Sequence, residues 1–350
     1  MDKALWFPAL LLATVILSPA CKQESGGTDA VPAKAGEEPA GQSGPLAEPT
    51  LPAVKPPALL SELKIEAGVG EPVSLLYAPV ERADYAVRLQ QVSTQHPGGK
   101  TVAMGMEQSF ILERTLVEGG DRQAWAVNLR IRDLEIKPSG KSKDKEMDSA
   151  MASLRDAIEK AHFRLHTTAT GKVDQFVLEG EGADRWSGMK DVLEQLVRDA
   201  VIELPDHPVK PGDTWQANRE TKVDRRKTVN RIRFTIQSKL VGLTKLDGHC
   251  ARCAVVETDS RFVIDGDVTA PGMSGKTVGK GQGSGVAVID IERGVIVKSA
   301  MAAVSSQAFE VRSKGRSQKF DEVMESTYSQ ELVEPGSKEP QKPQAKKVEK

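Results

Sequence analysis

The fold is decided by an alternating stretch at residues 125–132, which reads Trp125-Ala126-Val127-Asn128-Leu129-Arg130-Ile131-Arg132. Large apolar side chains occupy every second position, and small or polar residues stand between them. Successive side chains of a β-strand point to opposite faces, so this period predicts a strand with one buried and one wet face. Similar patterns mark five further predicted strands, at residues 85–90, 232–240, 255–264, 286–291 and 325–333.

The connections between these stretches favour antiparallel pairing. At residues 289–297, two apolar runs are separated by Glu292-Arg293-Gly294, and the glycine suits a hairpin because it adopts positive φ without steric cost. Residues 168–173, which contain Gly171, predict a second hairpin. Short strands joined by tight turns pair antiparallel, because parallel strands need long crossover connections.

Two stretches depart from the period of two. Residues 144–161 and residues 183–203 both place apolar side chains at helical spacing, and Pro205 ends the second pattern. An amphipathic helix needs a partner surface, and a sheet face is the one available. The sequence therefore predicts an α+β fold, in which a large curved antiparallel β-sheet, half-barrel-like in shape, carries two amphipathic helices packed on one face.

The beginning of the chain has the three regions of an export signal. A charged start is followed by an almost unbroken apolar run at residues 5–17 and then by Ser18-Pro19-Ala20-Cys21. The run is too short to remain in a bilayer as a spanning helix. A small residue before a cysteine at this point resembles the lipobox of bacterial lipoproteins, which implies lipidation of Cys21 and cleavage of the Ala20–Cys21 bond. The alternative is an ordinary secretory signal cut near Ala20, which leaves Cys21 free.

Composition divides the chain into four parts. Residues 1–20 form the predicted lipoprotein signal peptide. Residues 21–58 are rich in Pro, Gly, Ala, Glu and Ser and are predicted to be a disordered tether, because they hold too few large apolar residues to offset chain entropy. Residues 59–334 form the predicted antiparallel α+β domain. Residues 335–350 are rich in Lys, Glu, Pro and Gln and are predicted to be a disordered tail.

A proline-rich motif follows the second predicted helix. It reads Pro208-Val209-Lys210-Pro211-Gly212-Asp213-Thr214-Trp215, and a later turn holds the Asp-x-x-x-Gly pattern at 290–294. Here the chain resembles a group of uncharacterised bacterial envelope lipoproteins, over roughly residues 74–333. The resemblance implies an envelope location and this architecture, and it assigns no catalytic residues. The overall shape is similar to the half-barrels of bacterial lipoprotein carriers and mycobacterial lipid-binding lipoproteins, which is an analogy of fold alone.

Charge and aromatic content exclude some classes of partner. The formal net charge of the 350-residue chain is −1, so no long-range field favours nucleic acid or an anionic membrane face. Aromatic residues make up 4% of the chain, which is too few for a base-stacking or carbohydrate-binding surface. We therefore expect no nucleic-acid partner.

Cys250 and Cys253 are the two cysteines that remain if Cys21 is lipidated. Zinc is disfavoured, because His249 is the sole further ligand nearby in sequence. In a fully extended strand the two Cα atoms would lie about 10 Å apart, beyond the ~7 Å limit for a disulfide. A bridge therefore requires a turn or bulge, and a local disulfide and a reduced buried pair both remain open.

The sequence lacks the common motifs of catalysis and cofactor binding. The scattered histidines indicate no metal site, and the sequence contains no nucleophile elbow or Ser/His/Asp neighbourhood. Residues 272–285 contain Ser-Gly-Lys-Thr but lack the first glycine of a P-loop, so we interpret them as a flexible or strand-edge segment. The sequence predicts no enzyme, no catalytic residues, no metal and no cofactor.

The expected function is that of a membrane-anchored bacterial envelope lipoprotein. Lys22 after the cysteine indicates the outer membrane, by resemblance to enterobacterial sorting. One hypothesis is a binding module that holds lipid or another hydrophobic ligand in a cleft between helices and sheet. The alternative is a structural or interaction lipoprotein with a filled core, which contacts other envelope proteins.

Overall fold

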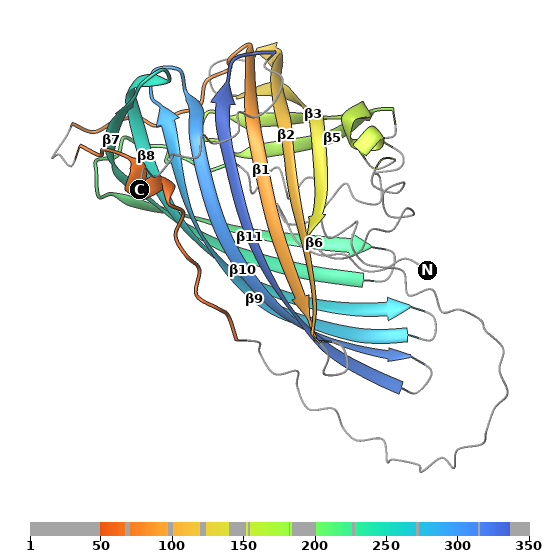
Figure 1. Cartoon of the computed structure of the whole chain (residues 1–350). Coiled ribbons are helices and arrows are strands. Elements are labelled where there is room, and N and C mark those ends of the chain that lie inside the picture. The colour runs from red at the N-terminus through yellow and green to blue at the C-terminus, as the bar shows by residue number, and fades with distance from the viewer. Residues whose placement is uncertain are drawn as a thin grey trace, which may run out of the picture.

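The structure is a computed structural model, and it describes residues 50–66, 71–96, 101–119, 124–139, 152, 155–181, 183, 201–225, 228–270, 273–313 and 316–336. In these ranges a single antiparallel sheet of eleven strands dominates the fold, in the order β5-β4-β3-β2-β1-β11-β10-β9-β8-β7-β6. Figure 1 shows that the strands are long and that the sheet is strongly curved and twisted.

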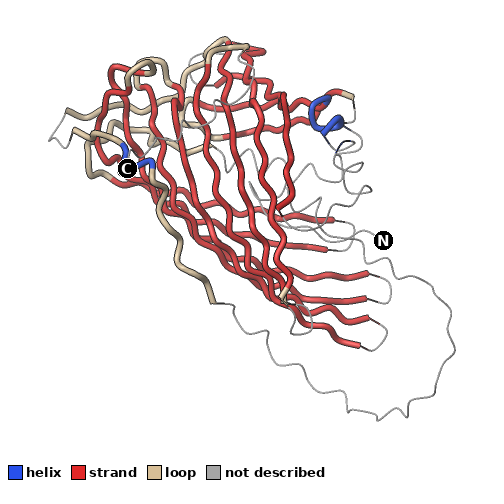
Figure 2. Tube along the Cα trace, in the orientation of Figure 1, coloured by secondary structure: helices blue, strands red, loops and turns tan. Residues whose placement is uncertain are grey.

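The named elements of the structure are one short helix, α2 (Leu59–Glu62), and the eleven strands of the sheet. They are β1 (Arg82–Gln95), β2 (Val102–Gly119), β3 (Ala124–Ser139), β4 (Ala161–Thr168), β5 (Val173–Gly180), β6 (Thr214–Arg225), β7 (Thr228–Leu246), β8 (Cys250–Ala270), β9 (Met273–Asp290), β10 (Val295–Ser313) and β11 (Arg316–Val333). Figure 2 shows how strand dominates the described chain.

The predicted antiparallel sheet is confirmed, and the predicted α+β class is wrong. Strands make up 71% of the structure and helices 5%, and no described helix has 7 or more residues. Of the first predicted helix, residues 155–160 are helical, with Ala157 and Ile158 buried, and Ala161 already begins β4. The second, at 183–203, lies outside the described residues except for Ala183, which is helical, and residues 201–203, which are not.

The class was mispredicted because many strands continue through polar sequence. Residues 272–285, interpreted above as flexible or at a strand edge, lie mostly in β9, which is paired on both sides with β8 and β10. Phe262 of β8 pairs with Gly281 of β9, and its ring occupies the space where a Cβ on Gly281 would lie. The apolar contribution to this part of β9 thus comes from the neighbouring strand, so the sequence of β9 alone shows no apolar period.

The main core packs on one face of the sheet. It joins side chains of β1, β3 and β4 to those of the segment before β1, including Val127, Leu165 and Leu75. On the other face, Leu59 of α2 packs with Val255 and Val286. Further upstream, the Pro52 carbonyl accepts a hydrogen bond of 3.0 Å from Gln282 Nε2, so the part of the predicted tether from Thr50 onward contacts the sheet.

A network of charged groups joins β1, β2 and β3 to the residues that follow β11. Asp84 is fully buried and accepts hydrogen bonds of 2.9 Å from Arg82 Nε, 3.0 Å from Arg132 and 3.0 Å from the Gly336 amide. Glu113 pairs with the same two arginines, at 3.2 Å and 2.9 Å. This network links β1, β2 and β3 to the first residues of the predicted tail.

Candidate functional site

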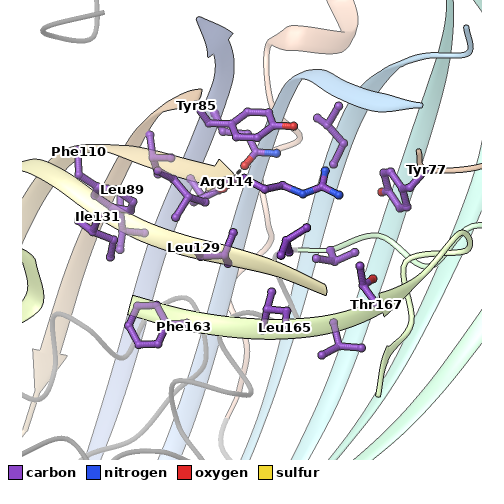
Figure 3. Close-up of a pocket in the computed structure, with 18 of the residues that line it drawn as sticks. Tyr77, Tyr85, Leu89, Phe110, Arg114, Leu129, Ile131, Phe163, Leu165 and Thr167 are labelled. Atoms are coloured by element: carbon purple, nitrogen blue, oxygen red, sulfur yellow. Dashed lines mark hydrogen bonds between the residues drawn. The ribbon is translucent and has the colours of Figure 1, made fainter. Parts of the chain in front are cut away.

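An apolar cavity of about 200 Å³ lies against the core face of the sheet. Its wall comes from β1 to β5 together with β10 and β11, and Tyr77 and Val201 approach it from outside the sheet. Figure 3 shows Phe110, Leu129, Ile131, Phe163 and Leu165 among the side chains that line it.

The strand register explains why these side chains share a face. Across β1 and β2, Val87 pairs with Phe110 and Tyr85 with Leu112. Across β3 and β4, Leu129 pairs with Phe163. Directly opposite residues of antiparallel strands project to the same side, so the period of two at 125–131 produces this wall directly.

Three tyrosines stand at the cavity. The Tyr77 hydroxyl donates a hydrogen bond of 3.1 Å to the Ile202 carbonyl, and the Tyr328 hydroxyl bonds to Gln330 Oε1. Burial raises the pKa of Tyr77, of Tyr85 and of Tyr328 above the ordinary value for tyrosine. Their hydroxyls therefore stay protonated and neutral at physiological pH.

Two polar atoms of the wall lack partners in the described part of the chain. Gln108 Oε1 and Trp125 Nε1 are buried and have no hydrogen-bond partner there. A buried polar atom without a partner costs about 1–3 kcal/mol. These positions mark the wall as suited to a ligand or water that supplies the missing bonds.

The cysteine pair lies away from this cavity. Cys250 and Cys253 are joined by a disulfide, with their Cα atoms 5.9 Å apart. The register shifts here, because Thr244 faces Cys253 while Leu246 faces Cys250, so two residues of β8 bulge opposite one of β7. The bulge supplies the bend that a bridge requires, and the redox state in solution stays a prediction.

The other sequence motifs have structural placements. In the proline-rich motif, the Gly212 amide donates to the Leu240 carbonyl at 2.7 Å, and Trp215 Nε1 donates to the Glu203 carbonyl at 2.8 Å. The motif thus ties the entry of β6 to its neighbours. Cys21, predicted to carry lipid, lies outside the described residues.

The described ranges contain neither a metal site nor a membrane-spanning helix. No three His, Cys, Asp or Glu residues lie close enough there to hold a metal ion. Every helix in those ranges is too short or too polar to cross a bilayer.

The sequence prediction of a cleft missed the charged member of the cavity wall. Arg114 follows Phe110 and Leu112 at intervals of two, on the face that those apolar residues bury. A basic residue at an apolar-face position is the signal that could have identified it. The helix side of the predicted cleft lies outside the described residues, apart from its end at Val201.

Comparison with known proteins identifies no family. No protein-family model and no curated protein matches the chain. Among solved structures, Neisserial surface protein A aligns over 71% of this chain and 97% of its own, at 7% identity and a TM-score of 0.18. The Pseudomonas aeruginosa protein OccK2 (OpdF), in complex with glucuronate, aligns over 74% of this chain and 100% of its own, at 6% identity and a TM-score of 0.20. TM-scores this low do not establish a shared fold, and we draw no conclusion about function from them.

Proposed function

We propose that this chain is a bacterial envelope lipoprotein that binds a hydrophobic ligand in the cavity beside β1 to β5. The observation that carries the binding proposal is the cavity itself, about 200 Å³ in volume and walled mainly by aliphatic and aromatic side chains. A cavity of ~150 Å³ is already large enough to bind a small apolar molecule such as benzene.

Filling the cavity tests the binding proposal. Val127 lines it and is buried, so Val127→Phe adds a ring to space that the ligand would occupy. We expect the affinity for the neutral apolar dye N-phenyl-1-naphthylamine to fall about tenfold or more, as overpacking costs about 1–3 kcal/mol. Fluorescence titration of the dye against residues 22–350, which lack the apolar signal and Cys21, measures this affinity without detergent.

A matched control separates blocked binding from general damage. Val117 of β2 is exposed and does not line the cavity, so Val117→Phe should leave dye affinity unchanged. Equal affinity of both variants and the parent for the dye would contradict a ligand site in this cavity.

The membrane anchor is proposed at Cys21. We expect metabolic labelling with a clickable palmitate to mark the wild-type chain and to be lost in Cys21→Ser. Loss of the acyl chains weakens the free energy of membrane binding by about 0.8 kcal/mol for each CH₂ group that was buried in the bilayer. Replacing both Cys250 and Cys253 by serine should leave labelling intact. An unlabelled wild-type chain would indicate an ordinary secretory signal instead.

An interaction role is the second candidate. In the described sheet, β5 and β6 stand at the two ends of the strand order. An edge strand presents backbone groups that another chain can pair with. This role predicts that envelope proteins are recovered by cross-linking from residues of β5 or β6. It also predicts that the parent protein and Val127→Phe alike bind no dye, because a filled core has no space for it.

A further inference from the structure

Arg114 is the one charged side chain among the described residues of the cavity wall. It lies on β2, six residues beyond Gln108, which also lines the cavity. At about 3.4 Å per residue, the two positions are about 20 Å apart along the strand. Figure 3 shows the Arg114 guanidinium between Tyr85 and Tyr77, with Leu129, Phe163 and Leu165 among the apolar side chains elsewhere on the wall.

The charge of Arg114 is not balanced by an acid of the described chain. Other arginines nearby are paired there, since Arg82 and Arg132 contact Asp84 and Arg293 contacts Asp290 at 2.6 Å. Arg114 interacts with the side chain of Tyr85 and forms no ion pair within the described ranges. The tyrosines remain neutral, so they supply no countercharge.

A cation beside an apolar cavity favours an anionic partner. Arg114 is half-buried, and a charge partly removed from water is stabilised by pairing. The planar guanidinium matches a carboxylate with two parallel hydrogen bonds. The protein supplies the cation and the apolar wall, so the missing part is an anion attached to an aliphatic chain.

We propose that the cavity ligand is a long-chain carboxylate, whose head group pairs with Arg114 and whose chain lies along β2 toward Gln108. This assignment rests on the proposed binding function and adds the chemical class of the ligand. It makes head-group charge, and not chain length alone, a determinant of affinity.

The test compares dodecanoate with dodecanol as competitors of the bound dye, again with residues 22–350. We expect the carboxylate to bind about ten- to hundredfold more tightly than the alcohol, as a charged hydrogen bond contributes about 1.5–3 kcal/mol. In Arg114→Gln this preference should disappear while dodecanol still binds. Arg114→Lys, which keeps the charge without the planar fork, should retain part of the preference.

Arg130 supplies the control, because it is an exposed arginine on the adjacent strand β3. Arg130→Gln should keep the full preference for dodecanoate. Equal affinity for acid and alcohol in the parent protein, or an unchanged preference in Arg114→Gln, would overturn the head-group assignment and leave the cavity as a site for neutral ligands. Failure of dye, acid and alcohol alike to bind the parent would instead overturn the binding function.

Discussion

Replacing Asp84 with alanine is expected to lower the free energy of unfolding by about 3 kcal/mol, because it leaves two arginines and an amide without their shared acceptor. The carboxylate is fully buried, and Arg82, Arg132 and the Gly336 amide all bond to it. Chemical denaturation at neutral pH measures the loss. Asp84→Asn should recover part of it, because the amide oxygen still accepts hydrogen bonds.

Asp84 should also make the free energy of unfolding depend on pH. Burial opposes ionisation of Asp84, but the hydrogen bonds from Arg82 and Gly336 outweigh it, so the pKa lies below the usual value. A carboxyl with a lowered pKa stabilises the fold at pH above its unfolded value of about 3.9, and this contribution disappears as the pH falls through the folded pKa. The difference between wild type and Asp84→Asn should therefore shrink below about pH 4.

An exposed ion pair provides the control for this prediction. Glu135 contacts Lys137 at 2.8 Å, and both side chains are more than half exposed. Glu135→Ala should change the free energy of unfolding by less than about 1 kcal/mol. Equal losses for Asp84→Ala and Glu135→Ala would show that the buried network contributes no more than a surface pair.

The second large effect is expected at Gly294, where valine should cost about 2–5 kcal/mol of stability. The glycine has a φ of 61°, and a side chain in that region costs about 1–2 kcal/mol. A Cβ would also lie 2.5 Å from the Ala78 amide nitrogen and 2.8 Å from the Leu76 carbonyl oxygen, which adds about 1–3 kcal/mol for overpacking. Thermal unfolding of the variant measures the sum.

Gly248 separates the cost of the positive φ from the cost of the close contacts, because it has only the first. Its φ is 79°, and no atom lies within 4 Å of the position that a Cβ would take. Gly248→Val should therefore cost only the conformational part, about 1–2 kcal/mol. Because Ala78 follows Tyr77, Gly294→Val should also weaken dye binding, and Gly248→Val should not. Equal stabilities of the two variants would contradict the close contact at Gly294.

The parts of the fold that sequence predicted correctly are those in which each strand carries its own apolar period. Residues 125–132 lie within β3 as expected, and the turn at 292–294 joins β9 to β10. At this turn, Asp290 Oδ1 accepts hydrogen bonds from the amides of Glu292 and Arg293. At both places the residues of the segment itself were sufficient to predict the strand or the turn.

Sequence failed where the determinants are supplied by a neighbouring strand. Gly281 shows no sign of burial in its own stretch, because the covering ring of Phe262 stands 19 positions away in the sequence and meets it only through the register of β8 and β9. The position of Arg114 on the apolar face of β2 is visible in the sequence, but the side chains that β1 and β3 place around it are not. The cleft was predicted as helix against sheet, and the described wall is mainly strand.

The most direct measurement of the central claim is an experimental structure of the chain with 12-bromododecanoate, located by anomalous scattering from bromine. The proposed function predicts one bromine peak among the cavity side chains, on the side of Gln108, with the carboxylate at Arg114. A cavity filled by the chain's own side chains, with no bromine peak beside β1 to β5, would contradict it.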